Sequence, residues 1–105
     1  MSEIHLIKND PGLPSIVPVE GEPNTFSSGY WSLSEQSALS LLDGRIYFHE
    51  RQNDPSFFGG RIVDAWVQPE GEYRGRIVFK FIFAEACKGV KTSRAGWAQE
   101  MKIVV

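Results

Sequence analysis

The sequence predicts a mainly β (α+β) fold, a small bent or closed antiparallel β-barrel with one short helix. Apolar residues alternate with period two in three runs, 45–49, 61–68 and 76–84, which we expect to be neighbouring strands. The turn-forming residues Pro69 to Glu72 predict an antiparallel hairpin between the second and third runs, and 101–105 is expected to be a last strand. Because the strands are apolar on both faces, bending or closing the sheet would protect its edges.

The barrel is expected to occupy residues 25–105 as a single domain, since 105 residues can bury one core. Residues 1–24 are predicted to form a Pro-rich N-terminal arm. The four prolines between residues 11 and 23 lack the backbone donors that a strand inside a sheet needs. Within this arm, the apolar run from Ile4 to Ile7 is typical of an edge strand.

A short helix is expected from Glu35 to Leu42. Ser34 suits the N-cap, and Asp43-Gly44 has the residues that commonly end a helix. The apolar side chains are spaced to form one face. We expect Leu39 and Leu42 on that face to pack against an opening of the barrel.

Composition argues against several classes of protein. Hydrophobic residues make up 42% of the chain and charged residues 23%, which is ordinary for a globular domain. The single Cys87 cannot form an intramolecular disulfide, and no run of about 18 apolar residues appears. His5, His49 and Cys87 form no ligand pattern for a metal. We therefore expect a cytoplasmic protein without membrane contact, metal or cofactor.

Charge is divided unevenly along the chain. The net charge is −2, but residues 1–73 carry four basic and eleven acidic side chains, or −7, and residues 74–105 carry +5. The segment 87–98 has three basic side chains and no acidic one, and it ends near Trp97. This basic loop is either a solvated surface turn or a contact for phosphate. The basic side chains are Lys88, Lys91 and Arg94.

The loop after the first period-two run is rich in side chains that donate or accept hydrogen bonds. It includes His49, Asn53 and Ser56, followed by Phe57 and the glycines at 59–60, which permit close approach of a backbone. This combination favours a recognition site. No Ser or Cys nucleophile stands at a recognisable spacing from His49, so we expect no enzyme activity. The tryptophans can be core residues or stacking platforms, and Trp31 and Trp97 are the better candidates for stacking.

Five segments follow one another between residues 29 and 67. They are the aromatic strand at Tyr30-Trp31, the short helix, the strand from Gly44 to His49, the loop with Ser56, and the strand from Gly59 to Val63. Together they resemble the PUA-like barrel superfamily, particularly its EVE and ASCH members, although this chain has Asp43-Gly44 where those families have Gly-Asp. The resemblance implies a β-barrel. It also implies, as in many members, binding of RNA or of a modified or flipped base in an aromatic cleft.

Two functions remain open. The first is a small non-catalytic module that binds RNA or DNA, and the second is a protein–protein interaction or homodimerisation domain that uses the aromatic loop and the Pro-rich arm. A concave site shared by Trp31, Ser56 and Trp97 would favour the first, and a flat apolar patch around Phe57 and Phe58 would favour the second. In the first function Trp31, Phe57 and Trp97 stack on the base, His49, Asn53 and Ser56 read its polar edges, and Lys88, Lys91 and Arg94 meet phosphates.

Overall fold

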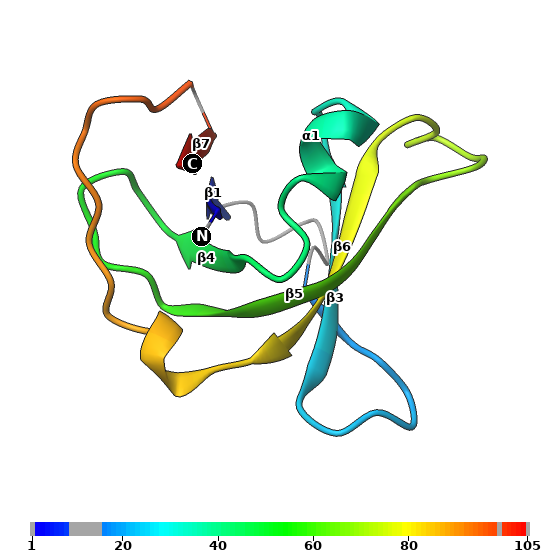
Figure 1. The fold of residues 1–105 in the computed structure, drawn as a ribbon, viewed down its shortest axis with the longest axis horizontal. Helices are drawn as coiled ribbons and strands as arrows, with labels where there is room; N and C mark the ends of the chain where they lie inside the picture. Colours follow the sequence, from blue (N-terminus) through cyan, green and yellow to red (C-terminus); the bar gives the residue numbers. More distant parts are fainter. Residues whose placement is uncertain (1, 9–15, 99, 105) are drawn as a thin grey trace.

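The computed structural model describes residues 2–8, 16–98 and 100–104. In these ranges the chain forms one seven-stranded sheet, one α-helix and one 3-10 turn (Figure 1). The strand order is β2-β3-β6-β5-β4-β1-β7. The predicted mainly β fold, a small bent sheet with one short helix, is confirmed. The elements are β1 (Glu3–Ile7), β2 (Val17–Pro18), β3 (Thr25–Trp31), α1 (Glu35–Leu39), β4 (Arg45–His49), β5 (Phe58–Val67), β6 (Ile77–Phe83), η1 (Glu85–Cys87) and β7 (Met101–Val104).

The three strands predicted from period-two runs are neighbours, as expected. β5 pairs antiparallel with β4 on one side and with β6 on the other. The hairpin between β5 and β6 is closed by a hydrogen bond of 2.8 Å from Gln68 N to Arg76 O. Gly71 and Gly75 in the turn have φ of +92° and +87°, a conformation that glycine adopts without strain. The turn chemistry of this segment therefore sets the register of the two strands.

β1 is not an edge strand, which corrects the prediction for Ile4 to Ile7. It lies between β4, to which it runs parallel, and β7, to which it runs antiparallel. Ile4 and Leu6 are fully buried. Pairing with β4 joins residues far apart in sequence, such as Ile4 and Ile46, and no local signal reveals such a partner. β7 is the strand at this end of the sheet.

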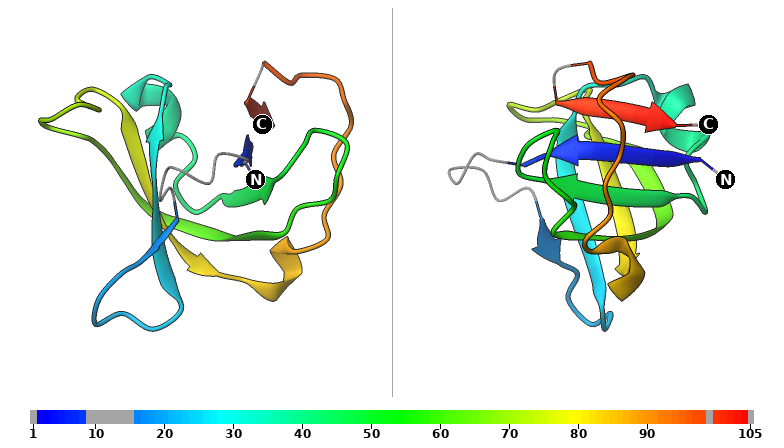
Figure 2. Two further views of the ribbon diagram at one scale, coloured as in Figure 1. Left: turned by 180° about the vertical axis from the view of Figure 1, so that it is seen from behind. Right: turned by 90° about the vertical axis from the view of Figure 1, so that its left-hand side faces the viewer.

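The sheet is strongly bent, so that β7, β1 and β4 form one wall and β3 and β6 form the other (Figures 1 and 2). β5 runs through the bend between them. Strand alternation directs large apolar side chains such as Ile46, Phe48, Ile62, Phe79 and Phe81 to the core, where all are fully buried. β2 and β7 are the end strands, and no pairing joins them in the described residues. The sheet therefore leaves an open seam.

The helix is shorter than predicted and buries a different face. Ser34 caps it as expected, because its Oγ accepts the N–H of Ser37 at 3.1 Å. Leu39 and Leu42 are 47% and 38% exposed, whereas Ala38 and Leu41 are buried in the core. The prediction that Leu39 and Leu42 pack against the barrel is therefore wrong. Helical spacing no longer applies beyond Leu39, where α1 ends and the chain turns toward β4.

The predicted arm, residues 1–24, contributes two strands to the sheet, β1 and β2. Pro18 lies in β2 at the sheet edge, where a residue without an N–H is tolerated. Pro11 and Pro14 lie outside the described residues. In the part of the chain that the structure describes, no helix has the length and apolar character needed to span a membrane.

Candidate functional site

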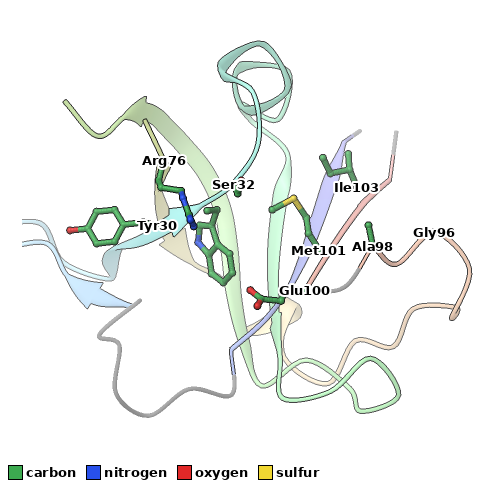
Figure 3. Close-up of a pocket in the computed structure, with 9 residues that line it drawn as sticks. Tyr30, Ser32, Arg76, Gly96, Ala98, Glu100, Met101 and Ile103 are labelled. Atoms are coloured by element: carbon green, nitrogen blue, oxygen red, sulfur yellow. The ribbon is translucent and has the colours of Figure 1, made fainter. Parts of the chain in front are cut away.

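A cleft of about 550 Å³ lies at the open seam, between the β3 and β6 side and the β7 side of the sheet (Figure 3). We call it the seam cleft. Tyr30 and Arg76 line one side of it, and Ala98, Met101 and Ile103 line the opposite side. Its volume falls within the range of about 300 to 1,000 Å³ that is common for small-molecule sites. Trp31, Ser32, Gly96 and Glu100 also line it.

β3 places two aromatic residues with different roles at the seam cleft. Trp31 is only 7% exposed, and its Nε1–H donates to Oγ of Ser28 at 3.0 Å. Tyr30 is 40% exposed, and its ring stacks on Tyr73, with 4.6 Å between centroids and 5° between planes. Trp31 therefore forms a buried wall. Figure 3 shows the Tyr30 ring directed away from Met101 and Ile103, so this ring borders the cleft without pointing into it.

Two charged side chains line the seam cleft, Arg76 and Glu100. Both are exposed, and neither has an ion-pair partner among the residues that the structure describes. A guanidinium donates up to five hydrogen bonds to oxyanions, and a carboxylate accepts N–H donors. The seam cleft therefore offers a ligand both signs of charge beside an apolar wall.

The basic loop crosses the outer face of β4, β1 and β7 before it reaches the seam cleft (Figure 2, right). Lys102 of β7 holds it in place, because Nζ donates to Oγ1 of Thr92 at 2.7 Å and to the carbonyl of Ser93 at 2.8 Å. Lys102 is 6% exposed. This buried amine therefore tethers the loop through neutral oxygens.

Trp97, at the end of the basic loop, covers two buried histidines. Its ring makes edge contacts with His5 and His49, with centroids 6.2 and 5.7 Å away. Burial, and then the nearby His49, lower the pKa of His5 from 6.5 to about 4, and the carboxylate of Glu3 offsets only part of this shift. His5 is therefore neutral at pH 7. His49 is fully buried, and neither histidine lines the seam cleft.

Ser56 joins two loops to each other. Its Oγ donates to the carbonyl of Cys87 at 2.6 Å and accepts the N–H of Val90 at 3.0 Å, and the residue is 3% exposed. Asn53 is exposed, and Phe57 is 38% exposed. None of Asn53, Ser56 and Phe57 lines the seam cleft.

The predicted phosphate contacts Lys88, Lys91 and Arg94 are all exposed. They lie on the basic loop, whose later residues Gly96 and Ala98 line the seam cleft. Of the six predicted ligand-binding residues, Trp31 lines this cleft, and the structure places the other five elsewhere. They are His49, Asn53, Ser56, Phe57 and Trp97.

Sequence reasoning missed Arg76, Glu100 and Met101 as cleft residues. Arg76 and Glu100 each directly precede an apolar strand, β6 and β7. Charged residues at strand starts are common on surfaces, so this position alone does not distinguish a binding residue. Only the folded sheet brings the starts of β6 and β7 to the same cleft.

The chain matches no protein-family model, and no curated protein or solved structure is significantly similar to it. Among the described residues, no group of three or more His, Cys, Asp or Glu side chains is arranged to hold a metal ion. The seam cleft offers aromatic surface, one guanidinium, one carboxylate and the Ser32 hydroxyl. This set of groups suits a planar polar ligand.

Proposed function

We propose that the protein is a non-catalytic binding module that takes a nucleobase or nucleotide of RNA or DNA into the seam cleft. The observation that carries this proposal is that Trp31, Arg76 and Glu100 line one cleft, and that neither charged side chain has an ion-pair partner among the described residues. A base needs a flat apolar surface and hydrogen-bonding partners at its edge, and its phosphate needs a cation.

Each group has a role that follows from its chemistry. Trp31, which lines the cleft, supplies the flat apolar surface against which the base packs. The carboxylate of Glu100 accepts N–H groups from the base edge, and the Arg76 guanidinium binds the adjacent phosphate. Met101 and Ile103 close the opposite side of the cleft.

Further support comes from the charge of the surrounding chain. Residues 74–105 carry a net charge of +5, and Lys91 and Arg94 are exposed on the loop that leads to the seam cleft. An acidic protein can bind a polyanion where positive charge is concentrated locally. The resemblance to PUA-like domains, many of which bind RNA or a modified base, points the same way. In this proposal Lys88, Lys91 and Arg94 contact more distant phosphates.

Titration of a labelled single-stranded oligonucleotide at two salt concentrations tests the proposal. Arg76→Gln should weaken binding and reduce the salt slope by about one unit, as should Lys91→Ala or Arg94→Ala. Trp31→Leu, in a protein shown to remain folded, should cost about 1 to 3 kcal/mol of binding with little change in slope. Arg74→Gln is the matched control, because Arg74 is an exposed arginine of the same hairpin that does not line the cleft.

Lack of binding of any oligonucleotide at low salt would remove this proposal. A protein partner is then the better candidate, because β7 is an end strand with Ile103 39% exposed and can pair with an added strand. The Phe57–Phe58 patch considered from the sequence is weaker support. Phe58 packs partly buried against the core, and Phe57 alone remains exposed.

A further inference from the structure

Two arginines face each other directly on the outer side of the sheet, away from the seam cleft. Arg45 of β4 and Arg61 of β5 are cross-strand partners in the antiparallel pair. Both line a second pocket of about 230 Å³ together with Asp43, Ile82, Phe83 and Ala84. None of these residues lines the seam cleft. This arginine pocket is therefore a separate feature.

Like charges at directly opposed positions of two strands repel each other. The described residues neutralise this pair only in part. Arg61 has one ion-pair partner, Asp43, at 3.4 Å, and both side chains are more than half exposed. Among the described residues, the hydrogen-bond partner of the Arg45 guanidinium is the sulfur of Cys87 at 4.0 Å, a weak acceptor.

A second carboxylate is close in register but is directed elsewhere. Glu3 of β1 stands opposite Arg45. Its Oε2 accepts the hydroxyl of Tyr47 at 3.2 Å, its Oε1 lies 3.7 Å from Nε2 of His5, and it forms no ion pair with Arg45. The arginine pocket therefore has two guanidinium groups and one exposed carboxylate, a net positive charge. The donors of Arg45 are available to a ligand.

We propose that the arginine pocket binds a phosphate group. Two guanidinium groups present several N–H donors to one tetrahedral oxyanion. A bound phosphate dianion would attract both Arg45 and Arg61 and so offset the repulsion between them. Ile82, Phe83 and Ala84 form an apolar wall, which strengthens charge interactions nearby by excluding water. The phosphate comes either from a small phosphorylated molecule or from a nucleic-acid backbone. The inference does not rest on the function proposed for the seam cleft.

Titration with inorganic phosphate at constant ionic strength, followed by amide and arginine side-chain NMR shifts, tests this inference. We expect saturable shifts around Arg45 and Arg61 in the millimolar range, and chloride should not reproduce them. Arg45→Gln or Arg61→Gln should weaken binding by about tenfold. Arg51→Gln is the matched control, because Arg51 is an exposed arginine with an aspartate partner, Asp54, but does not line the pocket.

For Asp43→Asn we expect the opposite effect, tighter phosphate binding. A variant that had lost its fold would not show this gain. The carboxylate competes with phosphate for Arg61, so its removal should tighten phosphate binding. Asn tolerates the φ of +67° at this position, so the backbone should be kept. Binding that stays unchanged in Asp43→Asn and in the arginine variants, or that falls equally in Arg51→Gln, would overturn the inference, as would shifts reproduced by chloride.

Competition separates the two sources of phosphate. If a single-stranded oligonucleotide displaces inorganic phosphate from Arg45 and Arg61, the ligand is a nucleic-acid backbone. If it does not, while phosphate binding still depends on both arginines, the ligand is a small phosphorylated molecule. If phosphate causes no NMR shift that depends on Arg45 and Arg61, the arginine pocket does not bind phosphate. This conclusion holds whatever the seam cleft binds.

Discussion

Nδ1 of His5 lies 2.9 Å from Nε2 of His49, and both side chains are almost completely inaccessible to solvent. The direction of this hydrogen bond follows from the other contact of His49. Its Nδ1 lies 2.9 Å from the carbonyl of Asp54, which can only accept, so this nitrogen carries a proton. A His49 ring that carries this one proton accepts at Nε2 from the N–H of His5. The pair connects β1 to β4.

This arrangement predicts that acid destabilises the protein through His5. The pKa of His5 is about 4 in the folded protein and 6.5 ordinarily, so between these values the unfolded chain binds more protons. The free energy of unfolding should therefore fall as the pH is lowered from about 6.5 to about 4. The contribution of this one group has a slope of up to about 1.4 kcal/mol per pH unit. Chemical denaturation at a series of pH values measures it.

His5→Asn provides the comparison, because its amide can still donate to His49 but does not titrate. In this variant the free energy of unfolding should depend less on pH in the same window. Equal pH dependence in the two proteins would show that His5 is not the group responsible.

Leu41→Ala should destabilise the protein by about 2 to 5 kcal/mol, because Leu41 is fully buried in the core. Leu39→Ala, at an exposed position of the same segment, should change stability by about 0.5 kcal/mol or less. Urea unfolding of the two variants compares them directly. A larger loss in Leu39→Ala than in Leu41→Ala would contradict the observed orientation of α1.

Ser56→Ala should lower the free energy of unfolding by about 1 to 3 kcal/mol, since it leaves the N–H of Val90 and the carbonyl of Cys87 without their partner. Amide hydrogen exchange of Val90 should become faster. Oligonucleotide binding at the seam cleft should not change, because Ser56 does not line it. Weaker binding by a stably folded Ser56→Ala protein would assign Ser56 a ligand-binding role after all.

Gly60→Ala should destabilise the protein by about 3 kcal/mol or more, because a Cβ there would collide with the backbone carbonyl of Ile82 in the neighbouring strand. Gly71→Ala is the control. A Cβ at Gly71 meets no atom within 4 Å, and only its positive φ opposes the change. The melting temperature of Gly60→Ala should be well below that of Gly71→Ala. The reverse order would count against the close packing of β5 on β6.

Local signals in the sequence were enough to predict several elements. Period-two alternation located β4, β5 and β6, turn residues joined β5 to β6, and Ser34 marked the start of α1. These signals are local because each strand alternates between two faces and each cap bonds within one turn. The pair Tyr30-Trp31 also stood out from the sequence, and Trp31 does line the seam cleft.

Contacts between distant segments could not be predicted in this way, because they depend on the folded arrangement of the whole sheet. The parallel pairing of β1 with β4 buried a strand that looked like an edge, and the end of α1 exposed Leu39 while Leu41 entered the core. The folding of the basic loop over β4, β1 and β7 made Trp97 a cover for His5 and His49. The sequence specifies the chemical type of each side chain. Its burial and its charge partners depend on which distant segments of the chain pack next to it. For that reason Arg76 and Glu100 line one cleft, and Arg45 stands opposite Arg61, only in the folded protein.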